Sequence, residues 1–295
     1  MEIDIDGKRK IIGITRAHLE EDAGKSIHDI YDGESAIDLN RAGTPLIEIV
    51  SEPDLRSPKE AVSYLKKIHS IVKCLGISDG NMEEGSFRCD ANISIRKPGD
   101  EYGIRAEIKN INSFKFVENA INYEMVRQQD ILESGGVVSQ ETRLYDPKKN
   151  ETRPMRSKEE ANDYRYFPDP DLLPVEVSQK QIEDIQKSLP ELPDARRNRL
   201  IEKYSLKADD AEILSLASNL CEYFENCLKD VSSEYQLLAN FILSEVVGLC
   251  NKKDTDISDI PIASDQVAKL HNYIIEGKIS IKQAKDILND IWEKD

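Results

Sequence analysis

The 295-residue sequence is poor in histidine, cysteine and aromatic residues, and its basic residues are outnumbered by its acidic ones. Its 40 Lys and Arg against 56 Asp and Glu give a formal net charge of −16. A general nucleic-acid-binding surface carries excess positive charge, because binding there depends on counterion release. The acidity excludes a generic nucleic-acid binder. It leaves room for a small acidic site that handles one end of a nucleic acid through a metal ion.

Other absences narrow the class further. No apolar run reaches the roughly 18 residues of a membrane span, and the charged start of the chain lacks the apolar core of a secretion signal. The four histidines form no His-x-His or His-x-x-x-His pair, which argues against a histidine-rich zinc site. The cysteines are odd in number and form no Cys-x-x-Cys pair, so we expect reduced core thiols in a cytoplasmic protein. They are Cys74, Cys89, Cys221, Cys227 and Cys250.

The first part of the chain, to about residue 174, combines strand and turn patterns with two helices. Residues 2–5 and 10–19 read as strands around an Asp6-Gly7 hairpin turn, and residues 45–50 read as a short buried strand. Residues 88–95 and 104–109 alternate between apolar and polar side chains. This alternation predicts a half-buried antiparallel sheet.

Two helices interrupt these strands. The first is predicted from Ser57, as N-cap with Pro58 and Glu60 in a capping box, to Gly76. The second is predicted from near Ser113 to residues 135–136. We expect both helices to lie on one face of the sheet, which makes the fold class α+β.

From about Pro190 the pattern changes to successive helices. Apolar residues recur at helical spacing, for example at Ala211, Leu214 and Leu220, and no strand pattern is convincing. We therefore predict two domains, residues 1–188 with the sheet and residues 189–295 all helical.

Acidic residues recur at strand ends and on polar strand faces. Glu48 is the most unusual, because it lies within the apolar strand 45–50, where a lone carboxylate would be costly without a partner. A divalent cation such as Mg²⁺ is one such partner. An ordinary salt-bridged sheet surface is the alternative, and the residues alone leave both open. The candidate metal ligands are Glu20, Glu21, Glu48, Glu84 and Glu107.

Basic residues near these acids suit a nucleoside triphosphate, whose transferred phosphate needs charge neutralisation. We predict catalytic roles for Arg88, Asp90 and Lys109. The turn at residues 23–26 is no P-loop, because Leu19 stands where the motif needs glycine, but its lysine could reach a phosphate. The candidate nucleotide-binding residues are Lys25, Arg156 and Arg165.

Residues 163–171, Asp-Tyr-Arg-Tyr-Phe-Pro-Asp-Pro-Asp, concentrate aromatic residues in a chain with only 6% of them. One interpretation is an edge that stacks on a base or an aminoacyl end. The other is closure of the core at a domain boundary, which the motif alone slightly favours.

Several long strings resemble the GatB family, which supplies one subunit of the aspartyl/glutamyl-tRNA amidotransferases. They are residues 18–28, 38–58, 82–94, 106–114, 163–171 and 189–197. The resemblance covers essentially the whole chain. It implies a glutamine-synthetase-like sheet in residues 1–188, the part of the family called the cradle, followed by a helical domain.

The resemblance also implies a reaction. ATP and Mg²⁺ phosphorylate the side-chain carboxylate of Glu-tRNA(Gln) or Asp-tRNA(Asn), and ammonia from glutamine displaces the phosphate. The implied assembly is a heterotrimer, in which an amidase subunit supplies the ammonia and a small third subunit ties the other two together. Matched by position, Glu21 and Glu48 resemble carboxylates of the family's magnesium ring. Glu20, Glu84 and Glu107 match a more variable acidic part.

The chain departs from the family pattern in one motif. The family completes its metal ring with a Glu-x-His pair, and none occurs in this sequence. We expect the chain to lack the front of the cradle domain and the family's tail domain. Two rivals to the enzyme interpretation stay open: a scaffold that only docks the amidase and small subunits, and a carboxylate kinase acting on a small metabolite. The sequence does not say which tRNA is used.

Overall fold

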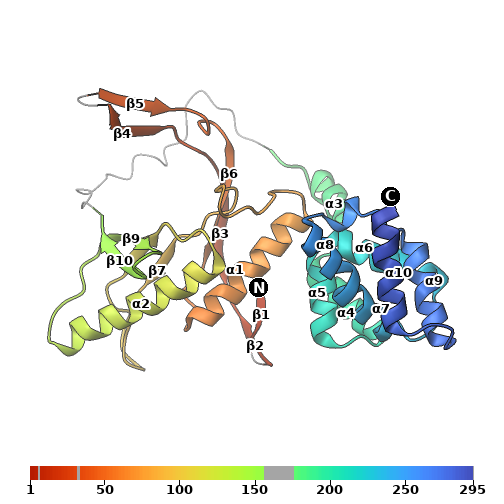
Figure 1. The fold of residues 1–295 in the computed structure, drawn as a ribbon. Helices are drawn as coiled ribbons and strands as arrows, with labels where there is room; N and C mark the ends of the chain where they lie inside the picture. Colours follow the sequence, from red (N-terminus) through yellow and green to blue (C-terminus); the bar gives the residue numbers. More distant parts are fainter. Residues whose placement is uncertain (6, 32–33, 156–175, 295) are drawn as a thin grey trace. The chain divides into compact units, whose positions relative to one another are not determined.

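The computed structural model describes the chain except for residues 6, 32–33, 156–175 and 295 (Figure 1). The chain divides into two compact units. The first contains Met1–Ile68 and Asn81–Asn162, and the second contains His69–Gly80 and Asp163–Asp295. The expected combination of an α+β part and an all-helical C-terminal part is confirmed. The boundary between residues 188 and 189 stays a prediction.

The first unit contains the strands, which in the described residues form four separate ladders instead of the single antiparallel sheet that we predicted. Strands β1 and β2, β3 and β6, and β4 and β5 form three two-stranded ribbons. The fourth ladder has the order β10-β9-β8-β7, and β8 and β9 run parallel. The bounds are β1 Glu2–Ile5, β2 Lys8–Ile11, β3 Ile14–Glu21, β4 Lys25–Tyr31, β5 Glu34–Asp38, β6 Pro45–Ser51, β7 Ala91–Ile93, β8 Ala106–Lys109, β9 Thr142–Asp146 and β10 Glu151–Pro154.

The predicted strand 10–19 is two strands. After the β1–β2 hairpin, in which Gly7 has a positive φ of 76°, the chain buries Ile12 and starts β3 at Ile14. Gly13 lies at this break, where its N–H donates to the Asp54 carboxylate at 2.8 Å. A Cβ on Gly13 would lie 2.6 Å from the Cγ of Glu52, so a larger residue would displace that side chain.

Both predicted helices are confirmed, as α1 (Pro58–Cys74) and α2 (Phe114–Glu133). Ser57 and Ser113 act as N-caps, accepting from the N–H groups of Glu60 and Phe116 at 3.2 and 3.1 Å. The capping box of α1 is only half formed. The Glu60 carboxylate accepts from the backbone N–H of Arg56 instead of from that of Ser57.

The core of the first unit combines one face of each helix with the buried face of the four-stranded ladder. Ala106 and Ile108 of β8 are fully buried, whereas Glu107 and Lys109 alternate with them and stay half-buried. This alternation was predicted, although β7 and β8 are shorter than expected. The core residues are Leu65, Met82, Ile93, Ile108, Ile111, Val117, Ala120, Ile121 and Tyr145.

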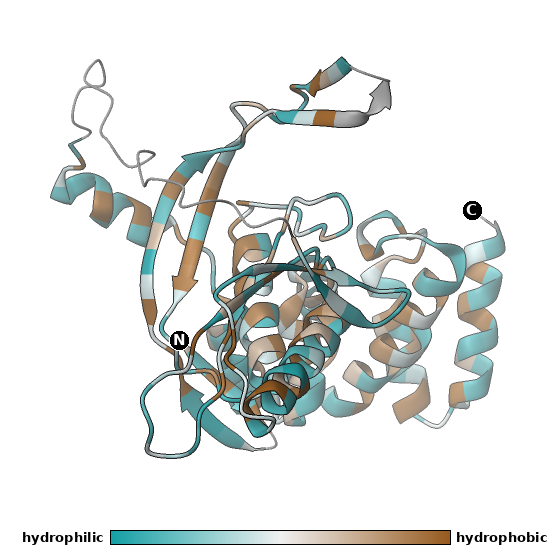
Figure 2. Cartoon of the chain, turned by 90° about the vertical axis from the view of Figure 1, so that its left-hand side faces the viewer, coloured by the Kyte–Doolittle hydropathy of each residue, from teal (hydrophilic) through white to brown (hydrophobic). Residues whose placement is uncertain are grey.

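Residues 45–50 form a strand, as predicted, within β6, but the prediction that this strand is buried is wrong. None of the residues of β6 is buried, because β6 belongs to a two-stranded ribbon with β3 instead of a packed sheet. Ile47 is 42% exposed and lies opposite Leu19, which is 81% exposed. Figure 2 shows hydrophobic and hydrophilic residues alternating along the long strands of the first unit.

The second unit is helical, as predicted, and Leu214, Phe224, Leu238 and Ile242 are fully buried in its core. Among the described helices, none combines the length and apolar character needed to cross a bilayer. All five cysteines are free thiols, and three of them are buried in this unit. The main helices are α3 Gln179–Ser188, α4 Pro193–Tyr204, α5 Ala208–Leu216, α6 Ser218–Cys227, α7 Tyr235–Phe241, α8 Val247–Lys253, α9 Ser264–Ile275 and α10 Ile281–Lys294.

Candidate functional site

The register of the β3–β6 ribbon assembles a polar cluster on one of its faces. His18 lies directly opposite Glu48 across the two antiparallel strands. Side chains two apart on a strand share a face, so Arg16 and Glu20 point to the same side as His18. The alternation of β3 therefore brings the side chains of Arg16, His18 and Glu20 beside the Glu48 carboxylate of β6.

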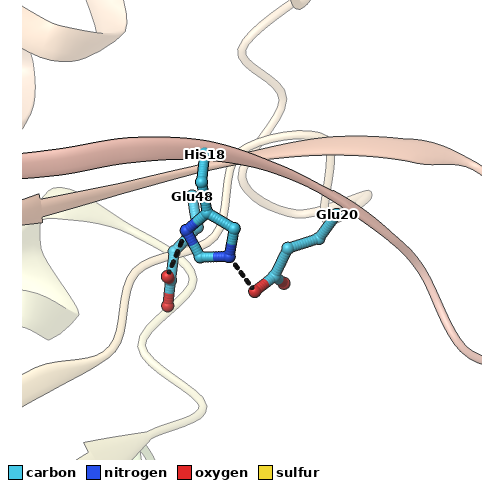
Figure 3. A group of neighbouring side chains, drawn as sticks. All are labelled: His18, Glu20 and Glu48. Atoms are coloured by element: carbon cyan, nitrogen blue, oxygen red, sulfur yellow. Dashed lines mark ion pairs between the residues drawn. The ribbon is translucent and has the colours of Figure 1, made fainter. Parts of the chain in front are cut away.

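The imidazole of His18 lies between the two carboxylates (Figure 3). Its Nε2 is 2.9 Å from Oε1 of Glu20, and its Nδ1 is 3.3 Å from Oε2 of Glu48. The same Glu48 oxygen lies 3.3 Å from Nη2 of Arg16. The three side chains of the cluster are 30 to 43% exposed, so solvent and ligands can reach them.

The donor set fits a divalent cation. One atom from each of His18, Glu20 and Glu48 lies within 4.8 Å of the other two, which allows one ion to contact all three. Carboxylate oxygens are the ligands that Mg²⁺ and Mn²⁺ prefer, and three protein ligands leave positions for water or phosphate oxygens. Exposed acidic groups also occur without a metal, and Arg16 already offsets part of the charge of Glu48.

Glu21 lies on the opposite face of the ribbon. It follows Glu20 directly and pairs with Pro45, so its side chain points away from the side that carries His18 and Glu48. The structure thus brings Glu20 to Glu48 and does not bring Glu21 there. The role of Glu21 as a metal ligand stays a prediction from the family resemblance.

A second polar group lies on the four-stranded ladder. Nζ of Lys109 is 2.6 Å from the Asp90 carboxylate and 3.4 Å from that of Glu107, which also accepts from the Thr142 hydroxyl at 2.8 Å. Burial lowers the pKa of Lys109, but the two carboxylates outweigh it, so the net pKa is raised and the ammonium stays charged. Glu107 and Glu48 therefore lie on different ladders, contrary to the single acidic sheet face that we expected.

The remaining predicted residues lie in turns or at strand ends. Arg88 donates to Asp22 at 3.1 Å, and the exposed Glu84 offers its carbonyl to Arg41 at 3.4 Å. Lys25 is the exposed first residue of β4 and pairs with Asp38. Strand β4 begins within the predicted turn 23–26, where a P-loop would be followed by a helix, and this agrees with the rejection of a P-loop. Arg156, Arg165 and the aromatic segment 163–171 lie outside the described residues.

Our reading of the sequence missed His18, Arg16, Asp22 and Arg41. The first two were detectable, because residues 14–20 alternate in the same way as residues 88–95, and the alternation places Arg16, His18 and Glu20 on one face. The partners of Asp22 lie 19 and 66 residues away in the chain, and only the fold reveals them.

Comparison with known proteins identifies the family of the chain. Residues 1–183 match the family model described as the GatB/GatE catalytic domain, and residues 222–295 match the one described as the GatB domain. The chain belongs to the GatB family. The resemblance that the sequence motifs indicated is thereby confirmed, and both polar groups described above fall within the match to the GatB/GatE catalytic domain.

Curated relatives agree with this assignment. The chain is 56% identical to the GatB subunit of the aspartyl/glutamyl-tRNA(Asn/Gln) amidotransferase of Thioalkalivibrio sulfidiphilus and to that of Vesicomyosocius okutanii, over 294 residues in each case. It is also 56% identical over 292 residues to the corresponding protein of Hydrogenovibrio crunogenus. Each alignment covers 99% of this chain but only 61 to 62% of the relative. The chain therefore spans about three fifths of the length of these GatB-family proteins.

Proposed function

We propose that this chain contributes the carboxylate-activating site of the GatB subunit of a tRNA-dependent amidotransferase. The substrates are Glu-tRNA(Gln) or Asp-tRNA(Asn), ATP and ammonia. The observation that carries the proposal is the His18–Glu20–Glu48 cluster, which lies within the match to the GatB/GatE catalytic domain and fits a divalent cation. Relatives that are 56% identical bear the name of this amidotransferase.

The proposed chemistry has two steps. The side-chain carboxylate of the attached amino acid attacks the γ-phosphate of ATP and releases ADP, which leaves an acyl phosphate. Ammonia then attacks the acyl carbon and expels inorganic phosphate, forming the amide. The first step brings two anions together and the second expels an anionic phosphate, so the site must supply positive charge.

The residues of this chain divide that work in the proposal. His18, Glu20 and Glu48 would hold a Mg²⁺ ion, which would offset the charge of the phosphate oxygens. Lys109, kept charged by Asp90 and Glu107, and Arg88 supply cations for the transferred phosphate. Lys25, Arg156 and Arg165 remain candidate nucleotide contacts. We propose that the chain acts in the cytoplasm, that an amidase subunit delivers the ammonia and that a small third subunit completes the heterotrimer.

Cation titration of the purified chain tests the site. We expect Mn²⁺ binding, followed by calorimetry, to weaken by about tenfold or more in Glu48→Gln and in Glu20→Gln, since even outer-shell partners of metal ligands contribute ~10- to 100-fold. Glu21→Gln is the matched control, because it removes the adjacent carboxylate from the other face of the ribbon. Loss of binding in Glu21→Gln with unchanged binding in Glu20→Gln would refute the geometric assignment and favour the one from the resemblance.

A catalytically incomplete scaffold is the second candidate. One observation favours it: the 295 residues contain no Glu-x-His pair. Reconstitution with the amidase and small subunits separates the two. The enzyme proposal expects ADP release that depends on Glu-tRNA or Asp-tRNA. The scaffold expects a complex that forms without such turnover, and stimulation by free glutamate would instead indicate a kinase for a small metabolite.

A further inference from the structure

Asp22 joins three segments that lie far apart in the sequence. It follows the last residue of β3, where its backbone N–H donates to the Thr44 carbonyl at 2.8 Å and its carbonyl accepts from Gly43 at 2.9 Å. Its carboxylate oxygen Oδ2 accepts from Nε of Arg41 at 2.7 Å and from Nη2 of Arg88 at 3.1 Å. The Asp22 side chain is only 14% exposed, so its carboxylate is largely shielded from solvent.

Arg41 also contacts the segment that carries Arg88. Its Nη1 donates to the Glu84 carbonyl at 3.4 Å, in the turn that leads to Arg88. Gly85 in that turn has a positive φ of 79°, a conformation that favours glycine. The segment that contains Arg41 and the segment that contains Glu84 and Arg88 are thus connected through the Asp22 carboxylate and the Glu84 carbonyl.

Two guanidinium groups converge on one carboxylate oxygen, which requires them to lie close to each other. The carboxylate oxygen of Asp22 lies within hydrogen-bond distance of both groups, so its negative charge offsets their repulsion. A guanidinium has five N–H donors, and within the described residues Arg88 uses one of them to donate to Asp22. Its side chain is 53% exposed, so its other donors face solvent.

We propose that Arg41 and Arg88 form a phosphate-binding pair and that Asp22 is the positioning residue that holds them. Guanidinium groups match phosphate oxygens in geometry and charge, and two fixed guanidiniums offer donors from two directions. The inference rests on the proposed function only in naming the phosphate chain of a nucleotide as the physiological ligand. Neither Arg41 nor Asp22 was expected from sequence motifs.

The surroundings explain why positioning matters here. Glu20 and Glu21 directly precede Asp22 in the chain, Glu83 and Glu84 shortly precede Arg88, and all four carboxylates repel a free anion. Two mobile arginines would form ion pairs with these acids. The local net charge is therefore unfavourable for an oxyanion. Its binding depends on the guanidinium donors that Asp22 holds close together.

Binding of inorganic pyrophosphate tests the pair without nucleotide or metal. Calorimetry of the full chain in EDTA should show binding that weakens by about tenfold or more in Arg41→Gln and in Arg88→Gln, because hydrogen bonds to charged groups contribute on that scale. Arg105→Gln is the matched control, since Arg105 is exposed and follows β7 in the same unit. Its affinity should change by less than about twofold, given that exposed charges contribute little.

Asp22→Asn separates positioning from simple charge. The variant removes a negative charge, so a purely electrostatic role predicts tighter pyrophosphate binding. A positioning role predicts weaker binding in spite of that gain, and it predicts no further loss when Asp22→Asn is added to the Arg41→Gln, Arg88→Gln double variant. Asparagine keeps an oxygen for the Ala23 N–H that now donates to Oδ1, which preserves the turn. Asp22→Glu restores the charge and is expected to restore part of the affinity.

Three results would overturn the inference: no pyrophosphate binding by the unmodified chain, unchanged affinity in both arginine variants, or tighter binding in Asp22→Asn. If Asp22→Asn fails to fold, as seen by circular dichroism, the arginine variants and Asp22→Glu still decide the outcome. The assay contains no metal, so loss of the Mn²⁺ site would refute the proposed function and leave this result standing. Absence of pyrophosphate binding with an intact Mn²⁺ site would refute the pair, and with it the phosphate contact of Arg88, and would leave the metal site standing.

Discussion

Glu124 provides the sharpest test of how the first unit is stabilised. It is the only acidic residue among the buried residues of the described chain, and it lies on α2. Its carboxylate accepts from Arg127 at 2.6 and 2.9 Å, from Gln128 at 2.8 Å and from the Thr152 hydroxyl at 3.2 Å. Nε of the buried Arg143 lies 3.4 Å away. Helix α2 is thus joined to β9 and β10 through one carboxylate.

Replacing Glu124 with alanine removes a carboxylate from Arg127 and from the buried Arg143, which both keep an ion pair with Glu141. Removing one partner of a buried ion pair costs about 3 to 5 kcal/mol of unfolding free energy, and we expect the lower end of this range because Glu141 remains. That range corresponds to a roughly 150- to 4,000-fold change in the unfolding equilibrium, at about tenfold for each 1.4 kcal/mol. Glu133→Ala is the matched control on the same helix. It loses one exposed hydrogen bond to Gln129 and should cost within about 0.5 kcal/mol.

Amide hydrogen exchange followed by mass spectrometry measures this change segment by segment. Exchange in residues 114–133 and 142–154 should accelerate by the stated factor in Glu124→Ala and hardly at all in Glu133→Ala. Peptides from the core of the helical unit, which contains no contact of Glu124, serve as an internal reference. An acceleration below about tenfold in Glu124→Ala, or equal effects in both variants, would refute the reasoning.

The stability that Glu124 contributes should decrease at acidic pH. Burial raises the pKa of Glu124, but hydrogen bonds from Arg127 and Gln128 and the charge of Arg143 outweigh it, so the net pKa lies below the ordinary value of 4.5. A carboxyl with a lowered folded-state pKa stabilises the protein above the unfolded pKa, and this stabilisation is lost as the pH falls through the folded value. Urea unfolding should show the difference between unmodified chain and Glu124→Ala shrinking below pH 4.5. A constant difference would contradict the assignment.

Three further predictions concern other parts of the chain. Ser113→Ala removes the N-cap of α2 and should lower the stability of the first unit by about 1 kcal/mol in urea unfolding, whereas no change would show that the cap is dispensable. Phe224→Ala opens a cavity in the helical core and should cost about 3 to 5 kcal/mol, read from the fluorescence of Trp292, which packs against that core; a loss below 1 kcal/mol would contradict the packing. Burial raises the pKa of Cys227 to about 12, so its reaction with a thiol reagent at pH 8 should require urea, and rapid native labelling would contradict its burial.

Local signals predicted the helices well because the information for them is short-range. The N-cap at Ser57, the cap at Ser113 and the apolar spacing of each helix are all contained within one segment. The alternation of residues 104–109 likewise predicted the buried Ala106 and Ile108. In these segments the prediction and the structure depend on the same local interactions.

The arrangement of the strands was not predictable in the same way. Alternation shows which side chains share a face, but it does not show which strand pairs with which, and β6 pairs only with β3 in the described part. The apolar run 45–50 correctly predicted a strand, but it could not show that this strand lacks a packed sheet around it. The sequence predicted two members of the cluster, Glu20 and Glu48, from their acidic side chains. The cross-strand register that adds His18 and leaves out Glu21 is a long-range property, which the sequence does not show.

The exposed Leu19 and Ile47 on the β3–β6 ribbon have a consequence for how the protein behaves in concentrated solution. An apolar strand face with open edges favours association between molecules, and a charge of −16 opposes it by repulsion. That repulsion is screened within about 10 Å at 0.1 M salt. Ionic strength therefore controls the balance. The chain should remain dispersed in dilute buffer at neutral pH, and it should self-associate as salt is added or as the pH is lowered toward its isoelectric point near 4.9.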